Sequence, residues 1–407
     1  GVSYRAAVRL AATYLLDRLM SLCAADTGHS RVDVRRVKML KPSQIPCEMV
    51  CGGTIDSGEM TDLFDMALAM ADVAGFAKRK AVSAENGKLR GIGFGMYLEQ
   101  CGNGADDGVD IEFQDDGRVI LHGSQQCNGQ GHQTTVTQIL SDRLGYDADL
   151  ITVKQGDSNR SPRGTTGGAR MTAVLGSATA FAAAKIIDLA KPFAAEVLEC
   201  NEDDLNFTDG LFLRQDTNRS IAIEDLVRQL AISGEKHRLN WAQPYETDGA
   251  TYPYGCHIIE LEIDRQTCAV DIASYHVVDD FGLVINPLTL EGQIHGGIAQ
   301  GVGQALLEHV VYDDSGQLLA GSLMDYALPR ADHFPGFQIS TRNTACANNV
   351  LGIKGSGEAG AIGAPQAVIS AICDALDITH IDMPATPLAI FNAMKAKAAN
   401  SPRQKGE

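Results

Sequence analysis

One stretch of small residues, from Lys354 to Pro365, constrains this chain more than any other. It holds a single carboxylate, Glu358, among glycines and alanines. Glycines let the backbone approach another group closely and adopt dihedral angles that other residues avoid. Apolar residues recur at helical spacing from Pro365 onward, so we expect a buried helix with this proline in its first turn. Lys354 is the nearest cation in the sequence.

Two interpretations of Glu358 follow from this setting. A carboxyl group buried without a partner has a raised pKa, and this suits it to proton abstraction. Alternatively, the stretch is a glycine-rich turn whose glutamate faces water, because short motifs often occur without a function. The stretch by itself leaves both interpretations open.

The composition is that of a globular protein with room for two or three domains. The chain has 407 residues, 44% of them hydrophobic. Its 51 acidic and 34 basic residues give a formal charge of −17, which argues against nucleic acid or an anionic membrane as a partner. We find no signal peptide and no apolar run of membrane-spanning length, and we expect a cytoplasmic location.

Ten cysteines are dispersed along the chain, and no C-x-x-C pair occurs. The spacing matches neither a zinc site nor an iron–sulfur cluster. We therefore expect free, mostly buried cysteines in a reducing compartment.

The hydrophobic periodicity changes several times along the chain, and this predicts a mixture of helices and strands. Residues 24–57 read as irregular, and residues 201–245 as loop-rich with one short helix at 223–230. The other expected helices cover 4–23, 57–77, 136–144, 172–199 and 305–310. The expected strands cover 91–98, 109–113, 118–121, 151–154, 257–263 and 269–278, with two more between 318 and 344.

Three further glycine-rich segments, 123–132, 164–170 and 292–303, each precede a helical pattern. Backbone N–H groups at the start of a helix favour anions such as phosphate, so two of these loops could hold two ends of one extended polar ligand. Ordinary connecting loops and close helix packing through small residues explain the same pattern equally well.

Six segments now stand in one order: 2–9, 125–133, 164–172, 292–303, 325–330 and 355–365. Together they cover nearly the whole chain, and their order resembles the molybdenum-binding subunit of the xanthine dehydrogenase/aldehyde oxidase family, the molybdenum hydroxylases. The resemblance favours the interpretation of Glu358 as a base.

The resemblance implies an α+β fold of elongated, multi-layer mixed sheets with packed helices, the second molybdopterin-binding domain of such an enzyme. On this basis residues 1–90 form a connecting helical segment. Residues 91–245 form a molybdopterin-binding subdomain with two glycine-rich loops, and residues 246–407 form a second subdomain that carries the Glu358 loop.

In the family, molybdenum is held by the dithiolene of a pterin, in bacteria usually extended as a cytosine dinucleotide, and no protein side chain ligates the metal. Many relatives have serine where this chain has Ala169 and Met171, so we expect backbone rather than hydroxyl contacts there. The resemblance places the following residues at the cofactor: Tyr4, Arg5, Gln130, Gly131, Gly168, Ala169, Arg170, Thr172, Gln293, Gln300 and Gly357.

The implied reaction is hydroxylation of an electron-poor carbon, in an N-heteroaromatic ring or an aldehyde, with water as the oxygen source and Glu358 as the base. Electrons would pass to iron–sulfur clusters and FAD in partner subunits. The family's earlier half is absent from this sequence. We therefore expect three partners, namely that half as a separate chain, a [2Fe-2S] subunit and an FAD subunit, in a dimer of such heteromers. The alternatives are an inactive homologous scaffold and, more remotely, a protein that binds a phosphate ligand.

Three details of the sequence refine this expectation. Copper-dependent carbon monoxide dehydrogenases have a cysteine directly after the Tyr-Arg pair, whereas this chain has Ala6, which argues against a copper site. The same segment borders the metal site in the family, so Arg5 or Arg9 is expected near it, unless both lie on a solvent-facing helix. The strand at 91–98 ends at Glu99, and Tyr97, Glu99 and Cys101 line either a pocket or the core.

Overall fold

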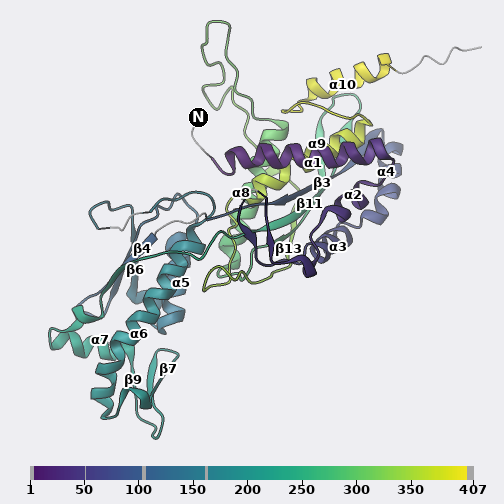
Figure 1. Cartoon of the computed structure of the whole chain (residues 1–407). Coiled ribbons are helices and arrows are strands. Elements are labelled where there is room, and N and C mark those ends of the chain that lie inside the picture. Colours follow the sequence, from purple (N-terminus) through teal and green to yellow (C-terminus); the bar gives the residue numbers. More distant parts are fainter. Residues whose placement is uncertain (1–3, 51, 103–106, 161–163, 401–407) are drawn as a thin grey trace, which may run out of the picture.

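The structure is a computed structural model that describes residues 4–50, 52–102, 107–160 and 164–400. Residues 2 and 3 of the first matching segment, Cys51 and the end of the polar tail lie outside these ranges. The chain forms a larger and a smaller lobe (Figure 1), and each lobe has a sheet of its own. This mixed α+β architecture confirms the fold class expected from the sequence.

The larger lobe is built on a four-stranded sheet in the order β13-β12-β11-β3. Its strands are antiparallel neighbours except for the parallel pair β12 and β13. The long helix α9 packs on one face of the sheet and α3 on the other, with α1 and α8 packed against α9. The bounds are β3 Lys88–Leu98, β11 Tyr254–Asp264, β12 Val270–Asp280, β13 Phe337–Thr341, α1 Ala7–Thr27, α3 Met60–Met70, α8 Pro287–Leu306 and α9 Ala359–Leu376.

The glycines of β3 explain why α9 lies so close to the sheet. A Cβ atom added at Gly93 would fall on the carbonyl oxygen of Ala367, and one at Gly91 on that of Ala371. The helix therefore packs directly on the strand backbone. The intervening Ile92 and Phe94 point to the opposite face and join the core beneath α3. This alternation of small and large residues is the pattern that predicted the strand.

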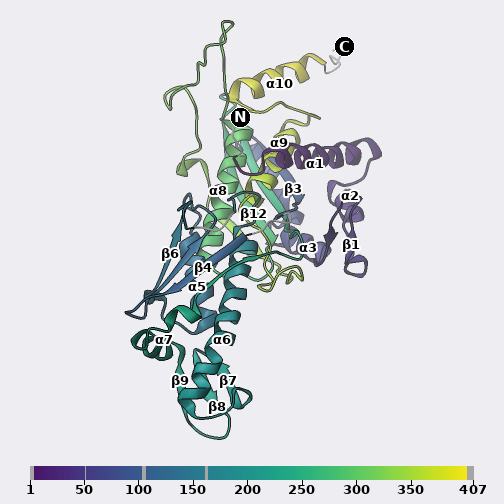
Figure 2. The ribbon, with the colours of Figure 1, turned by 60° about the vertical axis from the view of Figure 1, so that its left-hand side comes forward.

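The smaller lobe contains the sheet β10-β4-β5-β6 and a separate sheet β7-β8-β9. Helix α6 crosses its core, and α5 and α7 pack beside it (Figure 2). The predicted hairpin is confirmed as β4 and β5. The bounds are β4 Asp107–Phe113, β5 Val119–Gly123, β6 Ile151–Gln155, β7 Leu205–Thr208, β8 Leu211–Arg214, β9 Ser220–Ala222, β10 Trp241–Tyr245, α5 His132–Leu144, α6 Ser177–Leu198 and α7 Ile223–Ile232.

Several expected elements differ in the structure. Residues 201–245 contain the strands β7 to β10. The sequence did not predict these strands, because they are short and polar and are defined by their pairing with other strands. The segment 24–57 contains α2, and the polar stretch after 77 is helical in α4. Of two strands expected between 318 and 344, the described residues form β13 and a single bridge between Tyr312 and Leu318. The bounds are α2 Arg31–Lys38, α4 Phe76–Glu85, α10 Pro387–Asn400, β1 Cys47–Glu48 and β2 Thr54–Ile55. The shorter turns are η1 Pro42–Gln44, η2 Val73–Gly75, η3 Ala148–Leu150, η4 Thr172–Gly176, η5 Glu202–Asp204, η6 Lys236–Leu239 and η7 Ala331–His333.

The glycine-rich segment 292–303 and the later part of the stretch 354–365 are helical. The segment 292–303 lies inside α8, where Gly297 and Gly301 leave room for the backbone and small side chains of α9. Helix α9 begins at Ala359, so Pro365 lies inside the helix instead of in its first turn. In both helices, close packing of small residues outweighs the low helix propensity of glycine and proline.

The subdomain boundaries remain predictions, with one correction. Strand β3 was assigned to the central part of the chain, but it pairs with β11 along its whole length and belongs to the sheet of the larger lobe. Pairing with a strand that is distant in the sequence, and not position along the chain, decides to which lobe β3 belongs. The boundary at 245 falls where β10, the last strand of the smaller lobe, ends.

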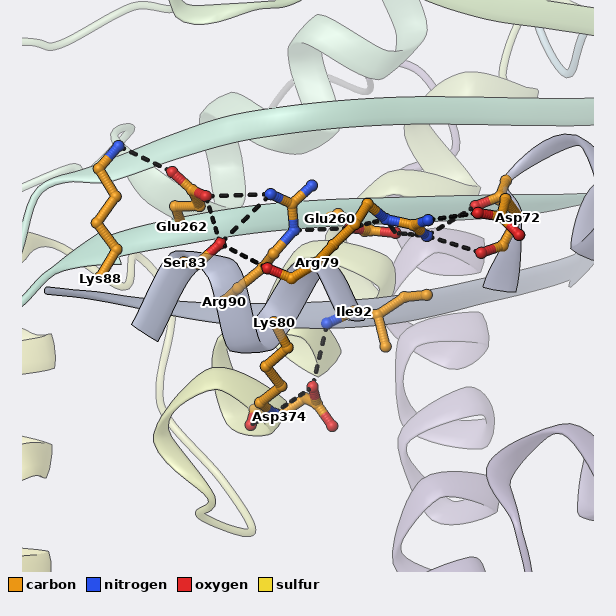
Figure 3. A network of polar contacts seen from close by, with 11 residues as sticks. Asp72, Arg79, Lys80, Ser83, Lys88, Arg90, Ile92, Glu260, Glu262 and Asp374 are labelled. Atoms are coloured by element: carbon orange, nitrogen blue, oxygen red, sulfur yellow. Dashed lines mark hydrogen bonds and ion pairs between the residues drawn. The ribbon is translucent and has the colours of Figure 1, made fainter. Parts of the chain in front are cut away.

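A network of ion pairs holds α4 against the edge of the main sheet (Figure 3). Glu260 of β11 is buried, and it accepts hydrogen bonds from Arg79 at 2.6 Å and from Arg90 at 2.7 Å. Glu262 likewise accepts from Lys88 at 2.8 Å. Buried carboxylates require such partners, so this network fixes the position of the helix.

Two helical stretches, Thr172–Leu198 and α9, are long and apolar enough by composition to cross a membrane, contrary to our expectation from the sequence. Of their most apolar windows, 67% and 94% are buried inside the protein. Such burial is typical of helices in a protein core.

The close packing of α9 on β3 predicts a strong effect of the substitution Gly93→Ala. Its methyl group would overlap the Ala367 carbonyl oxygen, so we expect a loss of roughly 3 kcal/mol or more in the free energy of unfolding. The control is Gly292→Ala on the exposed side of α8, where an added Cβ meets no atom within 4 Å. Denaturant unfolding of both variants is the measurement. Equal stability of the two would contradict the packing described here.

Candidate active site

A cavity of about 750 Å³ is lined by both lobes. Its size lies within the usual range for ligand and cofactor sites. Five segments line it: the start of α1, the loop before α5, the loop before α6, the segment after β12 with the first part of α8, and the loop before α9. The loops singled out from the sequence as ligand-binding therefore meet around one space.

The loop before α9 is fixed from beneath by Lys354. Its ammonium group donates to Asp280 at 2.9 Å, and both side chains are fully buried. It also donates to Ser57 O at 3.3 Å and Thr344 Oγ1 at 3.1 Å. Lys354, the nearest cation in the sequence, is therefore not the partner of Glu358, because its ammonium group is held by Asp280, Ser57 and Thr344.

Glu358 is the residue that directly precedes α9, and its side chain is 16% exposed. It lines the cavity together with Gly357. The positive end of the helix dipole favours a negative charge at this position. Among the described residues, the cation in contact with it is Arg9 of α1, whose Nη1 lies 3.9 Å from Glu358 Oε2. Glu358 therefore has a cationic neighbour from a distant part of the chain, which the sequence around it did not predict.

Arg9 also contacts a second carboxyl group, that of Glu99, at 3.3 Å. Glu99 follows β3, and its side chain is fully buried. Burial raises the pKa of Glu99 well above its usual value, and a hydrogen-bonding contact with Glu358 raises it further. Glu99 thus lies behind Glu358, and only Glu358 of the two lines the cavity.

The other two residues considered at this strand end belong to the core. Tyr97 is buried and donates a hydrogen bond to Asp279 at 2.8 Å. Cys101 is also buried, and its Cβ lies where a side chain at Gly355 would be. Cys101 therefore supports the loop before α9 from behind, whereas Tyr97 joins β3 to β12.

The start of α1 reaches the cavity through Tyr4 and Arg5. Arg5 Nη1 donates to the carbonyl of Gln293 at 3.0 Å. Arg9 contacts Glu99 and Glu358, so neither guanidinium group points only to bulk water. Gln293 lines the cavity. Gln300 lies further along α8, does not line the cavity, and donates to the carbonyl of Tyr4 at 3.2 Å. Gln300 therefore positions the segment rather than facing the cavity.

The two glycine-rich loops line the opposite wall. Gln130, Gly168, Ala169, Arg170 and Thr172 all border the cavity. Gly131 does not, because it caps α5, and its φ of 78° requires glycine. Thr172 opens a π-helical turn at the start of α6.

A large polar ligand with phosphate groups fits this wall. A Cβ added at Gly129 or Gly168 would meet no atom within 4 Å, so their backbone faces open space in the cavity. His132 also lines the cavity, and its buried Nδ1 has no hydrogen-bond partner among the described residues. Burial lowers its pKa to about 4, so this ring is neutral at pH 7 and available to a ligand.

The described residues contain no group of three or more His, Cys, Asp or Glu side chains that could hold a metal ion. The cysteines within the described ranges are free, and five of them are buried.

Sequence reasoning missed part of the wall. The loop that ends at His132 was predicted to bind the cofactor, but Thr135 and the segment around Val284, Ile285 and Thr289 also border the cavity and were not predicted. The Asn286-Pro287 pair signals a helix start, and Asn286 indeed caps α8, but nothing in the sequence placed this end beside α5. The contact is a hydrogen bond from Asn286 to Gln138 at 2.7 Å.

The buried ion pair beneath the loop predicts a large effect of Lys354→Met. This change would leave the Asp280 carboxylate buried without its cation, and we expect the free energy of unfolding to fall by about 3–5 kcal/mol. The control is Lys397→Met, which breaks an exposed pair with Asp377 and should change little. Adding Asp280→Asn to Lys354→Met should restore part of the loss. Equal effects of the two lysine changes would contradict the assignment.

Comparison with known proteins identifies the family of this chain. The model of the molybdopterin cofactor-binding domain family matches residues 66–335. The chain is 30% identical over 97% of its length to the carbon monoxide dehydrogenase large chain of Hydrogenophaga pseudoflava. It is 31% identical over 96% of its length to the gamma subunit of the 6-hydroxypseudooxynicotine dehydrogenase complex of Paenarthrobacter nicotinovorans. It covers 52% and 51% of these two proteins, about half the length of each.

Solved structures give the same result. The crystal structure of the Cu,Mo-CO dehydrogenase superposes with a TM-score of 0.91 at 27% identity, over 98% of this chain and 54% of that one. The quinoline 2-oxidoreductase of Pseudomonas putida 86 superposes with a TM-score of 0.87 at 29% identity, over 94% of this chain and 52% of that one. The chain therefore belongs to the molybdopterin cofactor-binding domain family, within the molybdenum-binding subunits of the xanthine dehydrogenase-type molybdenum hydroxylases.

Proposed function

We propose that this chain is the molybdenum-cofactor-binding part of an oxidoreductase that hydroxylates an electron-poor carbon with oxygen from water. Glu358 is the catalytic base in this proposal. The observation that carries it is the placement of this carboxylate, at the start of α9, in the wall of the same cavity that the two glycine-rich loops line.

The cofactor of this proposal is molybdopterin in its cytosine dinucleotide form. The loops containing Gln130 and Gly168 to Thr172 would hold it, with Gln293 and the backbone at Gly357 on the other side. Open backbone at the glycines suits phosphate oxygens, which accept hydrogen bonds from N–H groups. When bound, the group supplies a metal centre that accepts two electrons and activates oxygen from water.

The chain's own residues would perform three tasks. Glu358 accepts a proton in the cavity, a step that a positioned base accelerates by about 10²–10⁴-fold. Arg9 and the N-terminal end of α9 lie beside this carboxylate and fix its position in the cavity wall. The apolar side chains of Phe281, Leu283 and Ile285 line part of the cavity and give a ligand an apolar surface to contact.

The substrate class is an N-heteroaromatic ring or an aldehyde. Relatives of the chain include a nicotine 6-hydroxylase large subunit of Paenarthrobacter nicotinovorans, of which it covers 51% at 29% identity. The side chain that follows Tyr4-Arg5 is the methyl group of Ala6, so the thiol of the copper-dependent carbon monoxide dehydrogenases is absent at this position. This difference favours ring or aldehyde hydroxylation over carbon monoxide oxidation.

The proposed partners are the earlier half of a molybdenum-binding subunit, an iron–sulfur subunit and an FAD subunit, in a dimer of such heteromers in the cytoplasm. Exposed apolar side chains support binding of other chains. Val8, Leu15 and Leu16 on α1 are 80%, 60% and 60% exposed. The segment 307–330 projects from the larger lobe in both views (Figures 1 and 2) and exposes Leu323 and Met324. Apolar surface of this extent marks interaction sites.

The substitution Glu358→Gln tests the assigned base. It preserves shape and polarity but cannot accept the proton, so turnover should fall by about two orders of magnitude or more. Molybdenum and pterin content, measured on the same preparation, should stay normal. The control is Glu85→Gln at the exposed end of α4, which should leave turnover unchanged.

Two outcomes of this experiment would overturn the proposal. Normal turnover in a fully loaded Glu358→Gln variant would mean that the base lies elsewhere. Loss of the cofactor would mean that Glu358 is structural. A wild-type assembly that holds the cofactor but turns over no N-heteroaromatic ring or aldehyde would instead support an inactive scaffold.

The proposed assembly gives a prediction for purification. A tagged chain expressed with its natural partners should elute with at least one other polypeptide and contain molybdenum without stoichiometric copper. Size-exclusion chromatography, mass spectrometry and elemental analysis check this. A lone chain loaded with molybdenum would contradict the predicted partners, and copper at one equivalent would contradict the argument from Ala6.

A further inference from the structure

A second carboxyl group, Glu99, lies behind Glu358 and has no place in the proposed reaction so far. It directly follows β3, and its backbone N–H donates to the carbonyl of Pro253 at 2.9 Å. Its side chain is fully buried, whereas that of Glu358 is partly exposed to the cavity. Glu99 therefore cannot exchange places with Glu358 as the group that meets a ligand.

One buried oxygen of the Glu99 carboxyl group lacks a hydrogen-bond partner unless the group carries a proton. Its Oε1 accepts a hydrogen bond from Arg9 at 3.3 Å, but its buried Oε2 has no partner among the described residues when both carboxyl groups are ionised. The neighbouring carboxyl group is that of Glu358, because Arg9 Nη1 lies 3.3 Å from Glu99 Oε1 and 3.9 Å from Glu358 Oε2. Two ionised carboxylates repel and only accept hydrogen bonds, so the arrangement is satisfied when one proton lies between them.

The charges around the pair decide which group keeps this proton. Arg9 is the cation in contact with both carboxyl groups, and its side chain is 39% exposed, so its attraction is partly screened. Tyr97 and Cys101, the other titratable groups beside Glu99, are buried, and burial keeps both in their neutral forms. A hydrogen bond from the Cys101 thiol lowers the pKa of Glu99, but burial and the neighbouring Glu358 raise it by more. Glu358 has water, the cavity and the start of α9 beside it, whereas Glu99 has the protein interior. The negative charge is therefore more stable on Glu358 than on Glu99.

We propose that Glu99 is a positioning residue that keeps its proton, donates it in a hydrogen bond to Glu358, and so holds the Glu358 carboxylate ionised and directed toward the cavity. Arg9 balances the single negative charge of the pair. This inference rests on the proposed function of Glu358, but the protonation of Glu99 itself does not.

The proposal separates the effects of two substitutions. Glu99→Gln keeps a neutral hydrogen-bond donor at nearly the same position, so turnover and the acid limb of its pH profile should stay close to those of the wild type. Glu99→Leu removes the donor, which favours protonation of Glu358. The acid limb of the pH profile of Glu99→Leu should move upward by about one pH unit. At pH values below this limb, turnover of the variant should be about tenfold lower than that of the wild type, with the cofactor content unchanged.

The alkaline side of the profile provides a further distinction. Because the pKa of Glu99 is raised, Glu99 loses its proton only well above the usual range of a carboxyl group. An inhibition that sets in as Glu99 ionises beside Glu358 should be present in the wild type and absent from Glu99→Gln, which has no proton to lose. The two carboxyl groups titrate as a coupled pair, so the comparison concerns whole profiles.

Infrared difference spectroscopy of the intact assembly gives a readout that does not need turnover. The wild type at neutral pH should show a protonated-carboxyl stretch that disappears in Glu99→Gln and persists in the control Glu85→Gln. An unchanged band in Glu99→Gln would overturn the proposal. So would equal losses of turnover in Glu99→Gln and Glu99→Leu without any shift in the pH profiles, because a purely structural role predicts that result.

The failure of the proposed function is distinguishable from the failure of this inference. If Glu358→Gln is fully active while the infrared band follows Glu99, the base is misassigned but the protonated pair stands. If Glu358→Gln is inactive and the band does not follow Glu99, the base stands and the positioning role of Glu99 fails.

Discussion

The whole site depends on the close packing of α9 against β3 and α8. Three glycines of β3 and two of α8 have no side chains at this contact, so the helix lies directly on the backbone of both neighbours. Seventeen of its residues are buried. Because the helix cannot slide or tilt in such packing, its first residues are held at a fixed place in the cavity wall. Glu358 owes its position to this contact.

Electrostatics then acts on a carboxylate whose position is already set. The start of α9 and Arg9 favour negative charge on Glu358, while the buried Lys354 is neutralised by Asp280 and is not available to pair with it. The lysine therefore fixes the loop without weakening the base. Lys354 therefore has a structural role in the loop, whereas Arg9 is the cation in contact with Glu358 among the described residues.

Sequence patterns predicted much of this arrangement. The alternation at 91–98, the hairpin around 114–118 and the helix after Pro365 were readable because each depends on local spacing. Glu358 and the loops at Gln130 and Gly168 were identified, and the structure brings them to one cavity. Their roles remain proposals.

What the sequence could not give depends on distant contacts. The pairing of Lys354 with Asp280 joins residues 74 positions apart, and that of Arg9 with Glu99 joins residues 90 apart. The strands in 201–245 are short and polar, so pairing rather than periodicity defines them. The segment 292–303 resembled a loop because glycine is abundant, yet its glycines serve helix packing. In these cases tertiary contacts outweigh local propensity.

The central claim is that the cavity beside Glu358 holds the molybdenum cofactor. An anomalous difference map recorded at the molybdenum absorption edge, on crystals of the intact assembly, tests it most directly. We expect one strong peak inside the cavity, joined to the Glu358 carboxylate through a single oxygen or water ligand. A peak outside the cavity, or one whose nearest carboxylate is another residue, would contradict the account.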